Sequence, residues 1–485
     1  MPGFHVENFG CRATQADGAA LERQFLERGL EPAAAHEAEI VVINSCTVTD
    51  SADKDARAAI RRIQRVNPAA KILVTGCYAQ RAPEEIAALP GVSWVVGNSH
   101  KHQVAAVATA DFVPLGHLDQ PAAHHSILVG DIFAHTELLA APVFGAGDER
   151  TRPNLKVQDG CDNRCSFCVI PYVRGQSRSL KLDSALQEVR GLVANGYREA
   201  VISGINLGRW GRDFTPAARF EDLVRAILDR TSLEKLRISS VEPMDWSDEL
   251  IALVSGSGRV AKHAHVPMQS GSDAVLRRMH RKYRPWHYRE RILKIRKSMP
   301  TAAIGADVMV GFPGETDAEF EETSRMVGDL PFTYLHVFTY SARPGTPAAE
   351  MKKQVPAQVA RERNRRLREL AASKKNAFMR SFVGKTLEAI TLQSSDPCGS
   401  DTVVRPRNGP GKDVGSDPEI FTEALTDNYI KLRLRGRHEP NQWMTVEVEE
   451  VLRDVLIGSH RKLGPAGHEK LTTCDQELTT ASPML

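Results

Sequence analysis

Three apolar segments in the first hundred residues each end at a cysteine, and this repeat constrains the fold more than any other feature. The segments end at Cys11, Cys46 and Cys77, which stand 35 and 31 residues apart. A helical pattern follows each segment, so each interval has the length of one strand–helix step of a parallel sheet. The carboxyl ends of parallel strands share the edge where ligands bind. We therefore expect the three thiols to converge, the alternative being three separate buried thiols.

Local signals place the helices of this first domain. We expect Asp17 to be the N-cap of the first helix, with Gly29 near its end. The second helix is expected from about Ser51 to Val66, where Asn67-Pro68 stops it. A third helical pattern leads into a strand at Val92–Val96. Residues 1–107 are thus predicted to form a doubly wound, flavodoxin-like α/β domain.

A second group of cysteines, Cys161, Cys165 and Cys168, has the spacing C-x3-C-x2-C. Such a loop can wrap three thiolates around one inorganic centre, and soft thiolates suit iron–sulfur clusters or zinc. A structural zinc site needs a fourth cysteine or histidine, and none follows within Val169–Gly175. Three ligands for a four-iron cluster leave one iron open to a small molecule, which is a catalytic arrangement. A zinc site with a distant fourth ligand is the alternative.

The middle of the chain repeats the strand–helix alternation. Residues 108–150 contain several prolines and glycines, show weak periodicity and are expected to be a connector. Six strand–helix units over residues 151–380 predict a curved parallel sheet, a partial (β/α)6 barrel, with the Cys161 loop at its mouth. The strands are expected at Leu155–Gln158, Glu199–Ser203, Leu236–Ser240, His263–Pro267, Ile304–Val310 and Tyr334–Thr339.

The C-terminal part changes character. Residues 352–380 carry ten lysines and arginines against two acids, a pattern that fits a solvated helix face or a contact with a phosphate backbone. Residues 381–455 contain short alternating strands and predict a small antiparallel β-barrel. We expect a mobile loop at 395–418 and a disordered tail at 456–485. Cys398 and Cys474 lie in these two segments, and we assign neither a ligand role.

Composition limits the setting in which the protein works. The chain is 42% hydrophobic and 25% charged, as in an ordinary globular protein, and its formal net charge of +3 excludes neither acidic nor basic partners. No apolar run reaches the roughly 18 residues that a membrane-spanning helix needs. The first residues lack the pattern of a secretory signal. We therefore expect a cytoplasmic protein with no membrane partner, in which cysteines serve metal or redox chemistry.

Further candidate residues follow the strands of the predicted barrel. Glycine permits close backbone approach, Asn and Gln can bond to ribose or carboxylate, and Glu242 would be a polar group at the mouth. Ordinary turns between strands and helices are the alternative. The candidates for cofactor binding are Gly204, Asn206, Glu242, Gln269, Ser270, Gly311 and Gly314.

Basic residues supply candidates for RNA binding. Residues 277–284 mix cations with a tyrosine, which suits nucleic-acid phosphates and bases as well as a solvated loop. His263 and His265 alternate with apolar residues on one strand and are expected to be packed or hydrogen-bonded rather than ligands. The RNA-binding candidates are Arg278, Arg281 and Lys282, together with Arg365 and Arg366 of the basic helix.

With these motifs the sequence resembles the methylthiotransferases of the radical S-adenosylmethionine (SAM) superfamily, from Phe4 to about Val451. The loop from Cys161 resembles the superfamily signature, including the aromatic Phe167 before the last cysteine. Cys11, Cys46 and Cys77 match the three ligands of the family's auxiliary cluster. The resemblance implies a methylthiotransferase N-terminal domain, a radical SAM core and an RNA-binding barrel of the TRAM type. The sequence departs from the family pattern just after Cys11 and in the insertion of the terminal barrel.

Four short segments are similar to the branch of the family that acts on threonylcarbamoyladenosine in tRNA, the MtaB type. This similarity implies an enzyme that adds a methylthio group to C2 of N6-threonylcarbamoyladenosine at position 37, beside the anticodon. Isopentenyladenosine in tRNA or a ribosomal-protein aspartate are alternative substrates of the family. A zinc-stabilised RNA-binding protein without catalysis is an alternative of another class. The segments are Asn44–Thr49, Thr75–Gln80, Val266–Ser272 and Thr426–Tyr429.

The resemblance also implies cofactors and partners. The cofactors would be SAM and two 4Fe-4S clusters, one held by the loop from Cys161 to Cys168 and one by the three N-terminal cysteines. The partners would be tRNA and an electron donor such as a flavodoxin or ferredoxin. Because sulfur insertion would couple the two clusters, both sets of cysteines must face one shared cavity.

Overall fold

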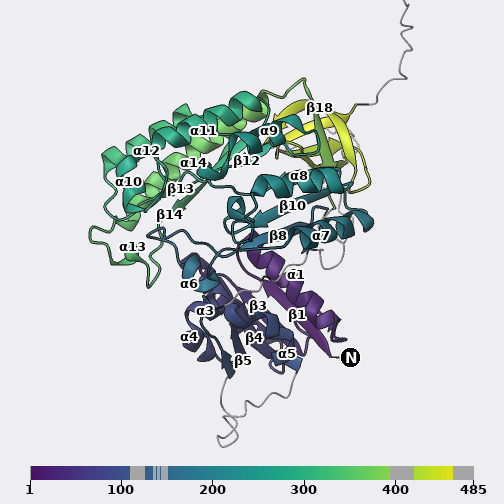
Figure 1. Ribbon diagram of the computed structural model, residues 1–485, viewed down its shortest axis with the longest axis vertical. Helices are drawn as coiled ribbons and strands as arrows, with labels where there is room; N and C mark the ends of the chain where they lie inside the picture. The colour runs from purple at the N-terminus through teal and green to yellow at the C-terminus, as the bar shows by residue number, and fades with distance from the viewer. Residues whose placement is uncertain are drawn as a thin grey trace, which may run out of the picture.

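The computed structural model describes residues 2–109, 126–134, 138, 142–143, 151–393 and 420–461. Figure 1 shows the N-terminal sheet with its helices (purple and blue) below a curved sheet (teal and green), with the C-terminal barrel (yellow) at one end of that sheet. Within the described ranges, no helix combines the length and the apolar character that crossing a membrane requires.

The N-terminal sheet consists of parallel strands, and buried β-branched residues account for them. All residues of its central strand, Ile40–Ser45, are buried. The spatial order β2-β1-β3-β4-β5-β6 is the flavodoxin-like order with one strand added at the edge, which confirms the prediction. The strands are β1 (Gly3–Asn8), β2 (Glu31–Pro32), β3 (Ile40–Ser45), β4 (Lys71–Gly76), β5 (Val92–Gly97) and β6 (Ser126–Leu128).

Helices cover both faces of this sheet. They are α1 (Arg12–Leu26), α2 (Asp50–Val66), α3 (Cys77–Arg81), α4 (Pro83–Ala87) and α5 (Val104–Thr109), with the 3-10 helix η1 (Asn98–Gln103) before α5. One face packs on α1 and α5 around Phe25 and Val104, and the other packs on α2, α3 and α4 around Ile60 and Tyr78. The sheet is therefore doubly wound, as expected.

The prediction that Asp17 caps the first helix is wrong. The helix begins at Arg12 with Cys11 as its N-cap residue, so Asp17 lies in the second turn. There it is 1% exposed and pairs with buried cations from other elements. Its carboxylate therefore compensates the charge of these buried cations instead of accepting hydrogen bonds from the amides at the start of the helix.

The middle of the chain forms the predicted curved parallel sheet. Two segments, β8-β10-β11 and β12-β13-β14, are joined by a bridge between Ser240 and His265. Apolar residues on one face of the strands pack on the surrounding helices, whereas Lys156, Gln158 and Arg237 alternate with them on the strands. The strands are β8 (Asn154–Asp159), β10 (Glu199–Gly204), β11 (Lys235–Ile238), β12 (His263–His265), β13 (Ala303–Val310) and β14 (Tyr334–Thr339).

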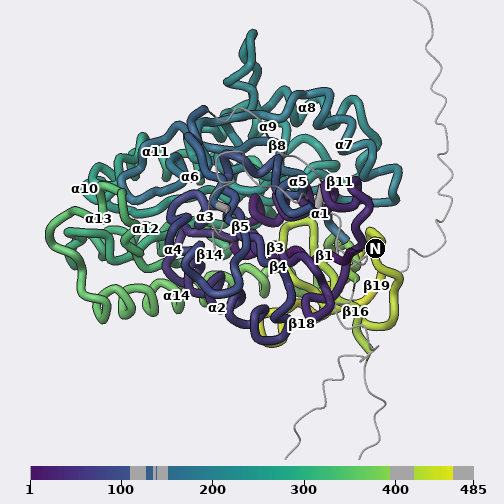
Figure 2. The backbone as a smooth tube through the Cα atoms, turned by 90° about the horizontal axis from the view of Figure 1, so that it is seen from below, coloured from purple at the N-terminus to yellow at the C-terminus, as the bar shows by residue number. Residues whose placement is uncertain are grey.

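The helices of this part lie outside the curved sheet. They are α6 (Ile170–Arg174), α7 (Leu182–Ala194), α8 (Phe220–Arg230), α9 (Asp248–Gly256), α10 (Asp273–Arg278), α11 (Pro285–Ser298), α12 (Asp317–Asp329), α13 (Pro347–Glu350) and α14 (Ala357–Arg380), with the 3-10 helices η2 (Leu207–Arg209) and η3 (Pro243–Asp245). Seen from below in Figure 2, the helices from α7 to α12 follow one another in an arc. This arrangement is the partial barrel expected from the sequence.

Part of the segment expected as a connector contributes to two sheets. Strand β6 pairs with β5, and the short strand β7 (Pro142–Val143) pairs with β8, which also pairs with β9 (Arg178–Ser179). The other residues of 110–150 lie outside the described ranges, apart from 129–134 and 138.

The C-terminal part is a closed barrel in the order β15-β16-β17-β19-β18. Its pairs are antiparallel as predicted, except that β17 and β19 run parallel. The strands are β15 (Thr386–Thr391), β16 (Phe421–Thr426), β17 (Lys431–Arg435), β18 (Trp443–Leu452) and β19 (Val455–His460).

The prediction of a disordered tail from residue 456 is wrong at its start, because β19 closes the barrel. Arg453 and Asp454 both have positive φ, 46° and 65°, and form the two-residue turn that returns the chain beside β18. This turn is difficult to predict from the sequence, because turns of this kind usually contain glycine or asparagine instead of arginine and aspartate. The insertion 395–418 and the tail from residue 462 lie outside the described residues, with Cys398 and Cys474.

A buried network of charges joins the N-terminal domain to the curved sheet. Asp17 of α1 accepts from Lys101 of η1 and from Arg174 of α6, each at 2.9 Å, and it also contacts Lys156 of β8. Asp159 at the end of β8 pairs with Lys156 and Arg174, again at 2.9 Å. Burial alone would raise the pKa of Asp17, but the three cations hold it well below its usual range.

We expect Asp17→Asn to destabilise the protein by about 3–5 kcal/mol, because it removes one partner of a buried ion network and leaves cations uncompensated. Urea unfolding followed by circular dichroism measures the change. The matched control is Asp183→Asn, since the Asp183 side chain is 90% exposed and its pair with Arg230 lies on the surface. Equal unfolding midpoints for the two variants would contradict the prediction.

Candidate active site

The three N-terminal cysteines lie at neighbouring strand ends of one sheet. Cys11 follows β1, Cys46 directly follows β3, and Cys77 directly follows β4 as the first residue of α3. The register aligns these strand ends, because Asn8 pairs with Asn44 and Ser45 pairs with Gly76. This is the edge at the topological switch point of a flavodoxin-like sheet, where ligands bind.

Two glycines allow the cysteine-bearing turns to approach one another. Gly10 has a φ of 108°, and a Cβ atom there would lie 2.8 Å from the sulfur of Cys46. Gly76 has a φ of 99°, and a Cβ atom there would lie 2.7 Å from the backbone nitrogen of Ser45. A side chain at either position would therefore push the turns apart.

The thiols of this group interact with one another. Burial raises the pKa of Cys46 to about 12, and the charges of Cys77 and Cys11 contribute to the increase. Cys46 and Cys77 are buried, whereas Cys11 is exposed. Three thiols gathered at one edge can hold an iron–sulfur cluster, which would release their protons and remove this mutual repulsion.

The second cysteine loop follows β8 and is held by the chain on both sides. The backbone N–H of Cys161 donates to the carbonyl of Gly175 at 3.0 Å, and the N–H of Ser166 donates to the carbonyl of Met279 at 3.1 Å. The Ser166 hydroxyl donates to the carbonyl of Arg278 at 2.7 Å. These bonds hold the loop against the segment after α10.

The thiols of this loop also share a small volume. Burial raises the pKa of Cys168 to about 12, with further contributions from Cys165 and Cys161. Asn206 Nδ2 lies 3.6 Å from the sulfur of Cys161, and Arg281 Nη1 lies 3.3 Å from the sulfur of Cys165. These contacts place hydrogen-bond donors on the sulfurs, as is common around thiolate-bound clusters. The donor set fits a cluster with three protein ligands.

The two cysteine groups lie beside each other. Val169, which follows Cys168, and Val173 pack with Cys77 in one buried cluster. Asn98 Nδ2 donates to the carbonyl of Val173 at 2.7 Å and lies 3.5 Å from the sulfur of Cys77. Helix α6 thus connects the end of one cysteine loop to the ligand edge of the other domain.

The candidates for cofactor binding divide into two sets. Gly204 and Asn206 adjoin Gln158, whose Oε1 accepts from the Asn206 N–H at 2.7 Å, and Glu242 pairs with Arg281 next to the cysteine loop. Gln269 has a φ of 64° and forms an isolated parallel β-bridge with Val308. Phe167 packs edge-on against Phe312 with ring centroids 6.5 Å apart, and Phe312 follows Gly311.

Ser270 and Gly314 have structural contacts instead. The Ser270 hydroxyl lies 3.1 Å from the hydroxyl of Thr323 on α12 and is 1% exposed. The carbonyl of Gly314 accepts from Arg278 at 3.3 Å. Both residues contact other elements behind the sheet, and their role in cofactor binding stays a prediction.

One RNA-binding candidate is buried, and three others pair with acidic side chains. Arg281 is 7% exposed and faces Cys165, so it is a residue of the cysteine loop rather than of the surface. Arg278 pairs with Glu319, Arg365 pairs with Glu362 and Glu369, and Arg366 pairs with Glu321. Lys282 is exposed. The physical reason is that nearby acids on α12 and α14 neutralise the basic face.

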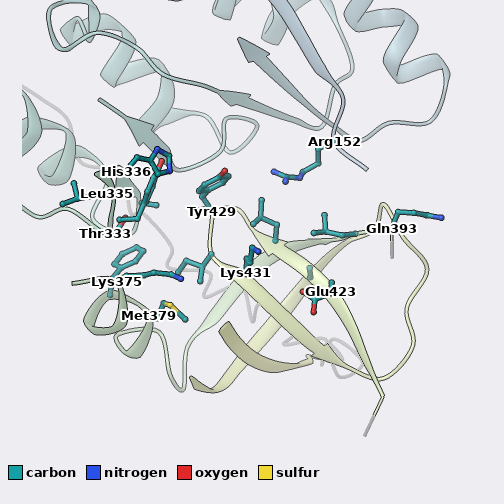
Figure 3. Close-up of a pocket in the computed structure, with 17 residues that line it drawn as sticks. Arg152, Thr333, Leu335, His336, Lys375, Met379, Gln393, Glu423, Tyr429 and Lys431 are labelled. Carbon is teal, nitrogen blue, oxygen red and sulfur yellow. The ribbon is translucent and has the colours of Figure 1, made fainter. Parts of the chain in front are cut away.

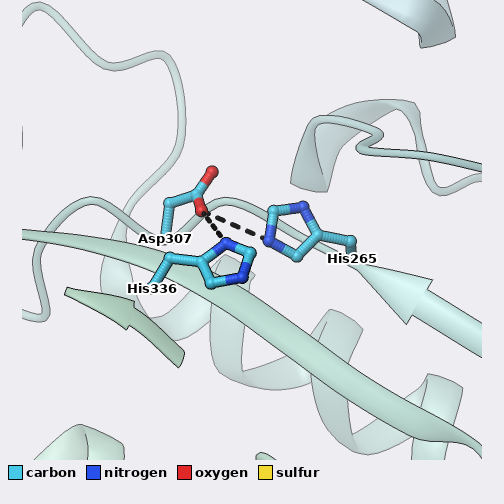
Figure 4. A group of neighbouring side chains, drawn as sticks. All are labelled: His265, Asp307 and His336. Atoms are coloured by element: carbon cyan, nitrogen blue, oxygen red, sulfur yellow. Dashed lines mark hydrogen bonds and ion pairs between the residues drawn. The ribbon is translucent and has the colours of Figure 1, made fainter. Parts of the chain in front are cut away.

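The inner face of the curved sheet carries a group of two histidines and one aspartate. Figure 4 shows His265 and His336 pointing at one oxygen of Asp307, at 3.3 Å and 3.2 Å. The three donor atoms lie within 4.8 Å of one another, and two imidazoles with a carboxylate can also bind iron. His336 is hydrogen-bonded to Asp307 and His265 to the hydroxyl of Ser240. Among the described residues, Nε2 of His265 has no hydrogen-bond partner and lies only at ion-pair distance from Asp307. His263 likewise bonds to the Tyr334 hydroxyl at 2.7 Å.

A cavity of about 660 Å³ lies between this sheet and the C-terminal barrel. Figure 3 shows His336 and Arg152 on its sheet side, Lys431 and Glu423 on its barrel side, and Tyr429 between them. A second cavity of about 260 Å³ shares Arg152 with the first and is also lined by Arg12. The volume of the larger cavity is typical of small-molecule sites.

Sequence reasoning missed the buried cations and their partners. Lys156 could have been recognised from the sequence, because a lysine inside an otherwise apolar predicted strand indicates a buried partner. Arg174 and Asn98 carried no such signal, since their neighbours come from other domains. Arg12 and Arg152 stand near chain segments without clear periodicity, so the sequence does not show that they meet.

Two family models match the chain. The model described as the radical SAM superfamily matches residues 155–327, and the uncharacterized protein family UPF0004 matches residues 3–97. The solved structure of the radical SAM methyltransferase TsrM from Kitasatospora setae has a TM-score of 0.52 and 16% identity, covering 72% of this chain and 75% of that one. This likeness shows the shared fold.

Curated relatives match almost the whole chain. The threonylcarbamoyladenosine tRNA methylthiotransferase MtaB of Bacillus subtilis is 35% identical over 443 residues, 90% of either chain. The MtaB protein of Aquifex aeolicus is 35% identical over 91% of this chain and 98% of its own length. A tRNA-2-methylthio-N(6)-dimethylallyladenosine synthase of Novosphingobium aromaticivorans is 33% identical over 94% of this chain and 96% of its own. The chain therefore belongs to the MtaB-type methylthiotransferases of the radical SAM superfamily.

Proposed function

We propose that this enzyme adds a methylthio group to C2 of N6-threonylcarbamoyladenosine at position 37 of tRNA. The observation that supports the proposal is the pair of three-cysteine groups, with helix α6, which follows the second group, packed on Cys77 of the first. The printed names of the relatives supply the substrate, since several act on threonylcarbamoyladenosine in tRNA. The aromatic C2–H bond is too inert for ordinary acid–base removal, so radical chemistry suits this substrate.

The radical SAM family implies SAM and one 4Fe-4S cluster, and the proposal adds a second cluster. Cys161, Cys165 and Cys168 would hold the first, and Cys11, Cys46 and Cys77 would hold the second. When bound, the clusters and SAM supply radical generation and the sulfur for insertion. The protein residues would hold the sulfurs and limit the access of water, because Cys46 and Cys77 are buried and Cys161, Cys165 and Cys168 are partly buried, whereas Cys11 is exposed.

The surroundings of the first cysteine loop suit a small polar cofactor. Glu242 and Arg281 pair beside Cys165, and Asn206 lies beside Cys161. Burial raises the pKa of Glu242, although Arg281 opposes the shift. A charged pair with a neighbouring amide can orient the amino and carboxylate groups of SAM through hydrogen bonds.

The partners follow from the same proposal. The tRNA would lie across the C-terminal barrel and the exposed cations, including Lys282 and Lys431. A flavodoxin or ferredoxin would supply electrons, and the reaction would take place in the cytoplasm. Analysis of tRNA nucleosides by mass spectrometry tests the substrate. A strain without this protein should lose the methylthio form of threonylcarbamoyladenosine, whereas loss from isopentenyladenosine instead would refute the proposal.

Replacing Cys165 by Ala should abolish SAM cleavage, because two thiolates cannot hold the first cluster in its open form. Liquid chromatography of 5′-deoxyadenosine after chemical reduction measures the cleavage. Binding of tRNA to this variant, measured by filter retention, should stay within about two-fold of the parent, since Cys165 contacts the loop after α10 and not the C-terminal barrel. Persistent cleavage would show that another centre performs the reaction.

Replacing Cys46 by Ala should leave SAM cleavage intact and stop sulfur insertion, because only the second group of thiolates is broken. The readouts are 5′-deoxyadenosine for cleavage and the methylthio nucleoside for insertion. Methylthiolation at the parental rate would refute a sulfur-holding role of this group.

Replacing Gly10 by Ala should halve the iron content, from roughly eight to roughly four atoms per chain if both clusters are 4Fe-4S. The added methyl group would collide with Cys46 and displace the turn that carries Cys11. Gly29→Ala is the matched control. Gly29 also has a positive φ, 76°, but no atom lies within 4 Å of a Cβ built there. Equal iron contents in the two variants would contradict the role of Gly10.

A further inference from the structure

Three arginines from different parts of the chain surround Tyr429, a loop residue of the C-terminal barrel. Arg12 at the start of α1 donates to the Tyr429 hydroxyl at 3.3 Å, and the guanidinium of Arg237 lies 5.4 Å from the centre of its ring. Arg152, just before β8, lines the same cavity as Tyr429. The N-terminal domain, the curved sheet and the barrel therefore each contribute to one cationic spot.

The positive charge at this spot is poorly compensated. Among the described residues, Glu199 is the single carboxylate that lies within 4 Å of any of the three guanidinium groups. Glu199 is fully buried, and its Oε1 accepts from Arg237 Nε at 2.6 Å. The same oxygen lies 3.8 Å from Arg152 Nη1, beyond hydrogen-bond reach. One carboxylate thus lies close to Arg152 and Arg237, and none lies within 4 Å of Arg12 among the described residues.

Of the two arginines near Glu199, Arg152 is the one whose positive charge is less compensated. Its Nη1 atom is buried and has no hydrogen-bond partner in the structure. Burial lowers the pKa of Arg152, and the neighbouring cations Arg237 and Arg12 lower it further, against the opposing effect of Glu199. A buried N–H donor without a hydrogen-bond partner is costly, so Nη1 of Arg152 favours the binding of an anion.

The cavities beside Arg152 have room for that anion and the group that bears it. The larger one, about 660 Å³, also exposes Tyr334 and His336 to an occupant, and these rings together with Tyr429 offer stacking surfaces. The smaller one, about 260 Å³, extends from Arg152 to Arg12, which follows the ligand candidate Cys11 directly. An occupant of this space therefore lies between the barrel and the N-terminal cysteines.

We propose that Arg152, assisted by Arg12, binds the carboxylate of the threonylcarbamoyl group of the target adenosine. This inference rests on the proposed function and names the group that recognises its substrate. A guanidinium can bind a carboxylate with two parallel hydrogen bonds. Unmodified adenosine and an isopentenyl substituent lack a carboxylate, so neither would satisfy Arg152. The site would thus select adenosines that already carry the acidic substituent.

Binding of two tRNA probes to the anaerobically purified protein tests the inference. One probe is tRNA that carries threonylcarbamoyladenosine without the methylthio group, and the other is a transcript of the same sequence with unmodified adenosine. The parent should bind the first probe about ten-fold more tightly or better, as expected for a hydrogen-bonded charge pair. Arg152→Gln should reduce this ratio to about one without changing the affinity for the transcript.

Two further variants separate recognition from folding. Arg152→Lys keeps the charge but loses the planar pair of donors, and it should retain part of the preference. Arg230→Gln is the matched control, because Arg230 is half exposed on α8 and pairs with the exposed Asp183. It should keep the full ratio. Thermal unfolding of each variant shows whether it is folded at the temperature of the binding measurement.

The other outcomes overturn the inference. If Arg152→Gln weakens both probes equally, Arg152 binds a backbone phosphate instead of the base substituent. An unchanged ratio in that variant, or no preference in the parent, shows that the carboxylate is not recognised here. The proposed function is judged separately, since mass spectrometry can find the methylthio nucleoside in cells with the parent protein whatever the binding ratio is.

Discussion

The buried network around Asp17 joins the N-terminal domain to the curved sheet, the two parts of the chain that carry the cysteine groups. Its members come from α1, η1, β8 and α6, so it fixes the N-terminal domain on the curved sheet at the point where both cysteine groups begin. Burying these charges is costly, and an apolar contact of similar size could give equal stability. A network with fixed donor directions permits few alternative orientations of the domains. Here it favours the orientation in which helix α6 reaches Cys77.

Parallel-sheet geometry made the cysteine edge predictable from the sequence. Each N-terminal cysteine closes a buried strand, and strands of one parallel sheet must end on the same side, so Cys46 and Cys77 could be placed together without any coordinates. The same reasoning placed the Cys161 loop at the mouth of the curved sheet. Periodicity also gave the six strands of that sheet within a few residues of their observed bounds.

Contacts between distant segments could not be predicted in this way. Aspartate is a common N-cap residue, so the sequence suggested that role for Asp17. Only its burial against Lys101 and Lys156 shows that it has a different role. Arg281 lies in a basic segment that is typical of an exposed surface. Its side chain is nevertheless buried, where it pairs with Glu242 and contacts Cys165. Strand β19 escaped notice because its turn uses Arg453 and Asp454 in place of glycine. In each case the deciding partner is far away in the sequence.

The charges around the N-terminal cysteines are consistent with an anionic group at that edge. Burial lowers the pKa of Arg174, but Asp159, Cys77, Asp17 and Cys11 together raise it well above its usual value. The two carboxylates of the network face the cations Lys101, Lys156 and Arg174, so positive charge remains after they are paired. A cluster held by three thiolates there would bring negative charge to the same edge, and a buried cation would compensate it better than water could in a closed site. The network that orients the domains therefore also provides the electrostatic environment that deprotonated cysteines require.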